Sequence, residues 1–183
     1  MFGCVSEPVK TADASDEYHV HADFLVVLNG EAKDFSLPEF QSNKPFNSTE
    51  SDKSKSPLTH LHDGKGNVVH VHAKGVTWKM FFESIGMNIN GNCFTDEKKD
   101  QYCSMRYFVN GEEFPEIADK EILDLDRVLI TYPLETEENA LEKEIQKELA
   151  QVTDEACIPS GKCLERGTPE DESSCITGEK CVE

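Results

Sequence analysis

The chain has 183 residues, of which 36 are acidic and 18 are basic, so its formal net charge is −18. An acidic surface repels the phosphates of nucleic acids and no basic stretch offsets it, so a nucleic-acid partner is not expected. The length allows one domain with a moderate core and some appendages. No apolar stretch reaches the roughly 18 residues that a membrane-spanning helix needs.

The N-terminus predicts a tether. Residues 1–17 are poor in large apolar side chains and begin Met1-Phe2-Gly3-Cys4. Gly3-Cys4 resembles the end of a bacterial lipobox, in which the cysteine after a small residue receives lipid. We therefore expect that Cys4 is lipidated and that this lipid attaches the chain to a membrane. The alternative is an unstructured N-terminus with an isolated thiol.

Three hairpins are predicted along the chain. Residues 18–28 are rich in β-branched and aromatic side chains, and Asn29-Gly30 is a strong hairpin turn before a return strand at 31–35. A second hairpin runs from His60 to His72. A third turns at Asn110-Gly111, and residues 127–132 form a closing strand.

Two helices complete the predicted elements. Thr77 can cap a helix whose apolar residues follow at helical spacing and which ends at Gly86; they are Trp78, Phe81, Phe82 and Ile85. A second helix is predicted within 137–152. Together these elements indicate an α+β fold, with antiparallel hairpins packed on one short helix in a β-grasp-like order. We expect the tether at 1–17, the α+β domain at 18–134, a C-terminal helix at 135–153 and a disulfide-stapled tail at 154–183.

Six of the seven cysteines are clustered in local loops, which is typical of a disulfide framework in an oxidising compartment. They are Cys93, Cys103, Cys157, Cys163, Cys175 and Cys181. We expect Cys93 to pair with Cys103 and the four tail cysteines to pair among themselves. A zinc site made of four cysteines is the rival interpretation, but the tail pairs are separated by five residues, whereas zinc knuckles favour two to four. The chain is therefore expected to be extracytoplasmic, in the cell envelope or secreted.

Every histidine of the chain belongs to a His-x-His pair. The pairs are His19 and His21, His60 and His62, and His70 and His72. On a strand, residues i and i+2 point to the same face about 6–7 Å apart, so each pair can converge on one metal ion. We interpret all six as metal ligands; the alternatives are structural histidines or a pH-sensing surface.

The second hairpin sets a condition on this interpretation. If its loop has an odd number of residues, both pairs share one face, for example with His62 opposite His70 and His60 opposite His72. The strand that begins at His19 is expected beside this hairpin. Asp23 extends the face of His19 and His21 and is either a ligand or an acceptor that orients an imidazole. Asp63 is expected in the turn.

The chemistry of the ligands limits which metals the site is expected to bind. Imidazole suits Cu, Zn, Ni and Fe, and a set without thiolate or thioether in an oxidising compartment points to Cu(II) first and Zn(II) second. Because a metal binds neutral imidazole, affinity should weaken as the pH falls through about 6.5, where imidazole ordinarily titrates.

The pattern also resembles a poorly characterised group of archaeal and candidate-phylum bacterial envelope proteins. The shared pattern is HxHADF…NG, then HLHDGxGNVVHVH, a T-W/L-x-x-FF helix, a cysteine-flanked loop and a closing LDRVLI strand, over about residues 18–181. This resemblance implies an extracytoplasmic location and a shared architecture.

The leading hypothesis is a binding protein that captures, buffers or delivers Cu or Zn outside the cytoplasm. The first alternative is a redox or hydrolytic metalloenzyme, with an open position on a histidine-ligated metal for water, O₂ or superoxide. The second is an envelope domain that bound metal stabilises. No Ser-His-Asp, Cys-His or phosphate-loop pattern supports catalysis without a metal, so the sequence favours a protein that is not an enzyme.

Overall fold

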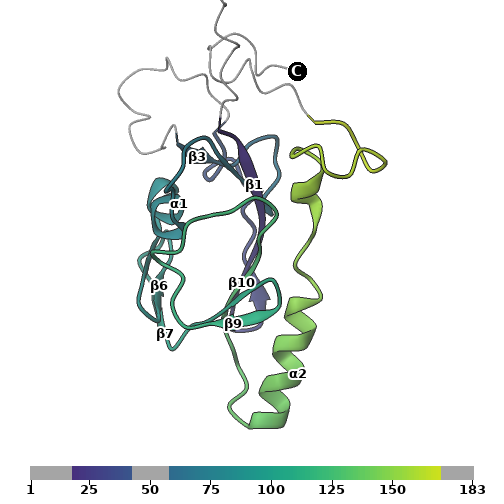
Figure 1. Cartoon of the computed structure of the whole chain (residues 1–183). Helices are drawn as coiled ribbons and strands as arrows, with labels where there is room; N and C mark the ends of the chain where they lie inside the picture. Colours follow the sequence, from purple (N-terminus) through teal and green to yellow (C-terminus); the bar gives the residue numbers. More distant parts are fainter. Residues whose placement is uncertain (1–17, 43–57, 170–183) are drawn as a thin grey trace, which may run out of the picture.

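A computed structural model of the chain describes residues 18–42 and 58–169 (Figure 1). The expectations for residues 1–17 and for Cys175 and Cys181 lie outside these ranges. Strands predominate and two α-helices accompany them, so the α+β class is confirmed.

The main sheet has seven strands with β1 and β10 at its centre. Its order is β3-β4-β1-β10-β8-β9, and β2 pairs with the far end of β1. β1 and β10 are parallel and the other neighbours are antiparallel. The strands are β1 Val20–Leu28, β2 Glu31–Ala32, β3 Thr59–His60, β4 Val68–Val71, β8 Arg106–Val109, β9 Glu112–Phe114 and β10 Arg127–Tyr132.

This topology agrees with part of the expected β-grasp-like order. The first and last strands form the central parallel pair, hairpin strands flank them, and both Asn-Gly turns have the left-handed backbone that such turns require (φ 54° and 76° at Asn29 and Gly30). Two features are additional to the β-grasp-like order: the hairpin β3–β4, which lies beside β1, and a separate small sheet.

The small sheet was not predicted from the sequence. It consists of β5 Asn88–Asn90, β6 Cys93–Thr95 and β7 Gln101–Cys103. Asp96 organises the turn between β6 and β7 because its carboxylate accepts the backbone N–H groups of Lys98 and Asp100 at 2.9 and 2.8 Å. Cys93 lies directly opposite Cys103, and the predicted disulfide between them is confirmed.

Helix α1, Trp78–Ser84, covers one face of the main sheet. The Thr77 side chain caps it by accepting the N–H of Met80, and Gly86 follows it with φ +82°, as the sequence predicted. Its aromatic side chains are fully buried against alternate residues of β1, among them Ala22, Phe24 and Val26. This face therefore holds the larger hydrophobic core.

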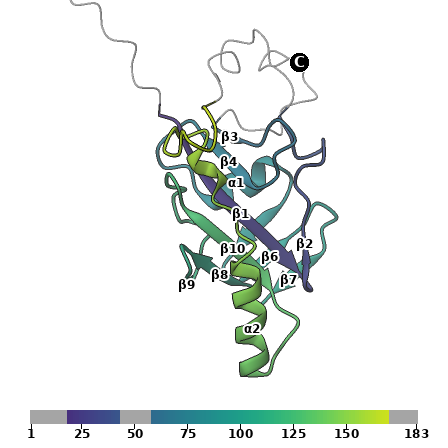
Figure 2. The same cartoon turned by 90° about the vertical axis from the view of Figure 1, so that its right-hand side faces the viewer.

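Helix α2, Glu138–Leu149, lies on the opposite face (Figure 2). It contributes Ile145 to a small cluster with Val27, Phe108, Leu129 and Val152. The chain then continues along the same face through the 3₁₀ helix η2, Glu155–Cys157, which contacts β1 and β4. η2 thus packs against the main sheet. Among the residues described, no helix is both long and apolar enough to cross a membrane.

Candidate metal centre

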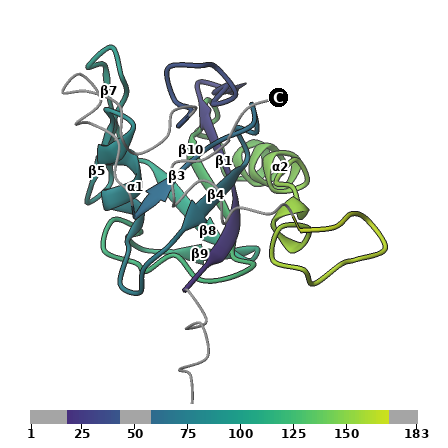
Figure 3. The ribbon, with the colours of Figure 1, turned by 90° about the horizontal axis from the view of Figure 1, so that it is seen from above.

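The pairing of β3, β4 and β1 brings the three His-x-His pairs together. β4 lies between β3 and β1 (Figure 3). Its His70 lies opposite His21 of β1 on one side and opposite His60 of β3 on the other. His19 precedes β1, one residue before the pair formed by Val20 and Val71. The expectation that the strand beginning at His19 neighbours the second hairpin is confirmed.

Both histidine pairs of the second hairpin lie on the same face of the sheet. Their intervening residues Leu61 and Val71 belong to the α1 core, so the histidines on either side of them point the other way. The observed pairing of His60 with His70 differs by two residues from the example given above. A shift of two preserves the face, whereas a shift of one would have separated the pairs.

All six imidazoles form a connected group of ring contacts. The closest ring centroids are those of His62 and His70, at 4.0 Å, and those of His19 and His21, at 4.3 Å. His72 stacks on His19 at 4.4 Å and on His60 at 4.9 Å. The group thus joins nitrogen donors from three neighbouring segments of the sheet.

Within this group, His19, His21 and His70 could hold a metal ion. Each offers one nitrogen, and these three atoms lie within 4.8 Å of one another. His21 and His70 are each only 1% exposed, and His19 is partly exposed. Two of the three candidate ligands are therefore buried.

A carboxylate-ended chain of contacts leads to His70. Asp63, which has φ +58° in the turn as predicted, places Oδ2 2.5 Å from Nδ1 of His62, and Nε2 of His62 lies 3.2 Å from Nδ1 of His70. An ionised carboxylate only accepts, so His62 carries a proton on Nδ1. When the His62 ring is neutral, its Nε2 accepts from Nδ1 of His70, and His70 keeps its lone pair on Nε2.

A second such chain leads to His21. Ser160 Oγ donates to Oδ1 of Asp124 at 2.5 Å and lies 2.8 Å from Nδ1 of His21. A hydroxyl has one proton, and here the carboxylate takes it, so Ser160 accepts from His21 Nδ1. His21 therefore also keeps its lone pair on Nε2. In metal sites, partners of this kind fix the tautomer and orientation of a ligating imidazole.

The turn that carries Asp124 is firmly held. Asp124 Oδ1 also accepts the backbone N–H of His21 at 3.2 Å, and the Leu125 N–H donates to the His21 carbonyl at 2.7 Å. The next carboxylate, Asp126, is buried and pairs with Lys120. Leu125 has φ +64°, an unusual conformation for a branched side chain, and these bonds hold it there.

Asp23 has other partners than the imidazole that we expected. Its carboxylate accepts from Thr153 Oγ1 at 2.5 Å and from the backbone N–H groups of Glu155 and Ala156 at 2.8 and 2.9 Å. Burial raises the pKa of Asp23, although these three bonds and the charge of Arg127 act in the opposite direction. Asp23 thus fastens the segment after α2 to β1, beside the histidines.

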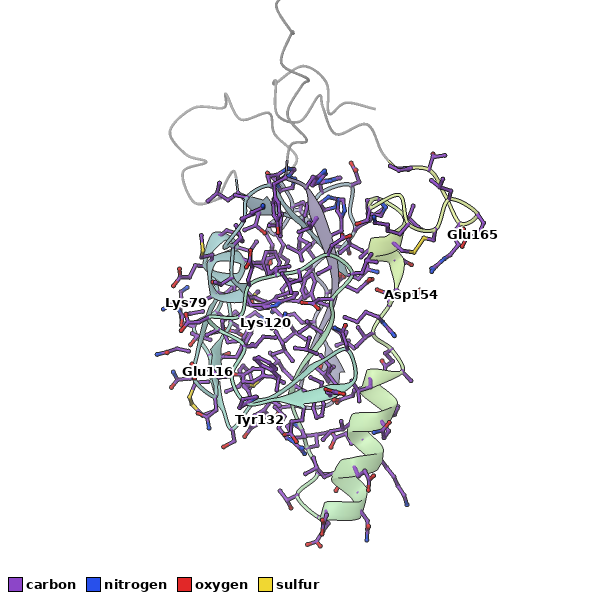
Figure 4. All side chains as sticks on the ribbon, viewed as in Figure 1. Lys79, Glu116, Lys120, Tyr132, Asp154 and Glu165 are labelled. Atoms are coloured by element: carbon purple, nitrogen blue, oxygen red, sulfur yellow. A yellow bond between two sulfur atoms is a disulfide. The ribbon has the colours of Figure 1, made fainter. Side chains whose placement is uncertain are left out.

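The sequence did not predict that the tail takes part in the site. Figure 4 shows Asp154 on the segment between α2 and the tail loop, on the opposite side of the domain from Lys79 of α1. Cys157 and Cys163 form a disulfide, as expected, and Ser160 lies inside the loop that it closes. One signal was present: the two tail repeats, CIPSGKC and CITGEKC, differ at this position, where the first has Ser160 and the second has glycine.

Comparisons of the chain with protein-family models, with curated proteins and with solved structures found no match.

Proposed function

We propose that the protein binds a transition-metal ion through His19, His21 and His70 and serves to capture, buffer or deliver that ion outside the cytoplasm. One observation carries the proposal: the three side chains, from two neighbouring strand segments, offer nitrogens within 4.8 Å of one another. The hydrogen bonds at Nδ1 of His21 and of His70 support the proposal, because a proton held on Nδ1 leaves Nε2 of the same neutral ring available to a metal.

The donor set favours Cu(II) or Zn(II). All of the candidate ligands are imidazoles, and the four cysteines in the described ranges are in disulfides, so they offer no thiolate. Nitrogen-rich sites without sulfur suit Cu(II), Zn(II) and Ni(II) better than Cu(I). His60 and His72, which contact His70 and His19, are in place to supply a further nitrogen after a side-chain rotation.

A three-ligand site also supports a second candidate, a metalloenzyme. Structural zinc sites usually have four protein ligands, whereas catalytic zinc sites have three and leave a position for substrate. An exchangeable carrier site benefits from the same open position. A search for hydrolytic and superoxide-consuming activity with the loaded protein separates the two, because a carrier releases metal to a chelator and turns over no substrate.

A purely structural metal, the third alternative, makes a different prediction. Small domains that depend on a metal unfold without it. Here the α1 face holds a large aromatic core that is independent of the histidines, so we expect the metal-free chain to remain folded. Complete loss of folded structure on chelation would favour the structural role.

The proposed location rests on the disulfides and on the resemblance to envelope proteins. Two disulfides within the described ranges fit an oxidising compartment. We propose that the chain acts in the cell envelope, anchored by lipid on Cys4 or secreted. Mass spectrometry of the N-terminal peptide from a native membrane fraction would test the lipid.

The metal proposal is tested by titration of the whole chain, purified without a histidine tag. Zn(II) and Cu(II) affinities are measured by competition with a chromophoric chelator, for wild type and for His19→Ala/His21→Ala, at neutral pH and two units lower. We expect weaker binding in the variant and at the lower pH, because protons compete for imidazole nitrogen.

The control is Asn88→Ala/Asn90→Ala, another pair at i and i+2, on the short strand β5 of the small sheet. This variant should bind as wild type does. If the histidine variant also binds as tightly as wild type, the first pair is outside the site. If neither the lower pH nor the replacement of His60, His62, His70 and His72 changes the affinity for Zn(II) and Cu(II), the metal proposal fails.

A further inference from the structure

The loop closed by Cys157 and Cys163 reaches from the tail to the buried His21. Ser160 lies at its middle and contacts the imidazole across 139 positions of sequence. The ring contacts among the histidines connect segments that the pairing of β3, β4 and β1 brings together. The contact with Ser160 depends instead on how a separate segment is held against the sheet.

Three sets of bonds hold that segment. Asp23 takes the N–H groups of Glu155 and Ala156, and Arg127 donates to the carbonyls of Val152 and Thr153 at 2.5 and 2.7 Å. Inside the loop, the Lys162 N–H bonds to the Cys157 carbonyl at 2.8 Å. The disulfide joins two cysteines that are six positions apart in the sequence and closes the loop that contains Ser160.

Resting on the metal-binding function proposed above, we propose that Ser160 is a positioning residue for His21 and that the loop closed by the Cys157–Cys163 disulfide sets the affinity of the site. With its proton committed to Asp124, Ser160 can only accept, so it holds the His21 proton on Nδ1 and presents Nε2 to the metal. Opening the loop removes the acceptor that fixes the proton of His21 on Nδ1. The tail is thus part of the metal site.

The loop is tested by replacing its disulfide with serines. Cys157→Ser/Cys163→Ser opens the loop without exposing the thiols of these two residues, which could bind metal themselves. We expect its Zn(II) affinity to fall about tenfold, the lower end of the roughly 10–100-fold range for loss of a partner of a metal ligand. The matched control is Cys93→Ser/Cys103→Ser, which opens the disulfide of the small sheet and should keep affinity within about twofold of wild type.

The serine is tested by Ser160→Ala, with Ser160→Thr as the conservative variant. The alanine variant should bind Zn(II) about 10–100-fold more weakly, and threonine should restore most of the affinity because it keeps a hydroxyl. Ser36→Ala is the control: Ser36 also donates its hydroxyl to a carboxylate, that of Asp34 at 2.6 Å, on the exposed surface. It should bind as wild type does.

A spectroscopic measurement separates positioning from general destabilisation. Long-range ¹⁵N–¹H NMR of the metal-free chain reports which ring nitrogen of His21 carries the proton. We expect the Nδ1–H tautomer in wild type and a mixture of tautomers in Ser160→Ala. Unchanged tautomer and unchanged affinity in that variant would overturn the proposal, as would an equal loss of affinity in the control that opens the small-sheet disulfide. If wild type itself binds neither Zn(II) nor Cu(II), the proposed function has failed instead.

Discussion

The two faces of the main sheet use the same strands for different purposes. On the α1 face, Ala22, Phe24 and Val26 of β1 pack into a continuous core with the helix aromatics. On the α2 face, the alternate positions begin with His19, His21 and Asp23 and reach a small apolar cluster only with Leu25 and Val27. Successive side chains of β1 point to opposite faces, so one face contributes to the stability of the fold and the other carries the candidate metal ligands. The fold tolerates a polar site on one face because the opposite face supplies most of the buried apolar surface.

The strongest test of this division removes an aromatic ring from the α1 face. Phe82 is fully buried and contacts Phe81 at 5.1 Å and Phe94 at 5.2 Å. Phe82→Ala should lower the free energy of unfolding by about 3–5 kcal/mol, as is usual for loss of a buried aromatic side chain. Urea denaturation of the metal-free protein measures it.

The milder Phe82→Leu variant keeps the protein folded for binding measurements. It should lower the free energy of unfolding by about 1 kcal/mol and leave the Zn(II) affinity of the folded protein within about twofold of wild type. A large drop in affinity would mean that the two faces are coupled, contrary to the division drawn here.

The second prediction compares two histidines that lie opposite one another. His70 belongs to the three-residue group and His60 does not, although their rings stack at 5.8 Å. His70→Ala should weaken Zn(II) binding by more than the roughly 10–100-fold typical of losing a partner of a ligand, whereas His60→Ala should weaken it less. Chelator competition measures both, and equal losses would extend the site to His60.

The sequence was sufficient to predict most of the main sheet. β-Branched and aromatic residues indicated β1, and the Asn-Gly turns indicated two hairpins. The His-x-His spacing allowed all six imidazoles to share a face on the condition that the loop of the second hairpin has an odd number of residues. The exact register of His60 with His70 was not predictable, because any even shift satisfies the pattern equally well. The small sheet was missed because its strands have three residues each, too few for a periodic signal.

The contribution of the tail could not be predicted for a different reason. Ser160 and Asp124 are ordinary polar residues in loops, and each acquires its role only from contacts between segments distant in the sequence. Asp23 was recognised as belonging to the histidine face. Its partners at residues 153–156 were not, because nothing local in the sequence indicates where the chain returns after a helix.

The third prediction concerns that return of the chain. Asp23→Asn keeps the shape of the side chain but replaces one acceptor oxygen with an amide NH2 group, which cannot accept from the three donors. Bonds to charged groups contribute about 1.5–3 kcal/mol each when removed, and we expect a loss of free energy of unfolding in that range. Hydrogen exchange should quicken at the amides of Glu155 and Ala156.

The amides of Lys98 and Asp100, which bond to the carboxylate of Asp96 in the small sheet, provide the internal control. Their exchange should not change in Asp23→Asn. Equal acceleration at both places would indicate global unfolding instead of release of the tail.

The smallest expected effect is a gain in stability on the α2 face. Glu148 is 4% exposed, and burial raises the pKa of its carboxyl, as does the charge of Glu144, while the charge of Lys147 acts in the opposite direction. A pKa that is higher in the folded than in the unfolded chain means that the folded protein binds the proton more tightly. Ionisation of Glu148 therefore costs stability above that folded pKa, and the cost disappears as the pH falls below the ordinary value of glutamate.

Glu148→Gln keeps the size of the side chain and removes this cost. We expect it to raise the free energy of unfolding by about 0.5–1 kcal/mol at pH 7 and to bring progressively less benefit as the pH falls toward about 4.3. Glu142→Gln, at an exposed position of the same helix, is the control and should give no such gain. A benefit that grows as the pH falls would reverse the sign and show that the ionised carboxylate is stabilising. The α2 face would then tolerate buried charge without cost, and the contrast with the aromatic face would be weaker than we propose.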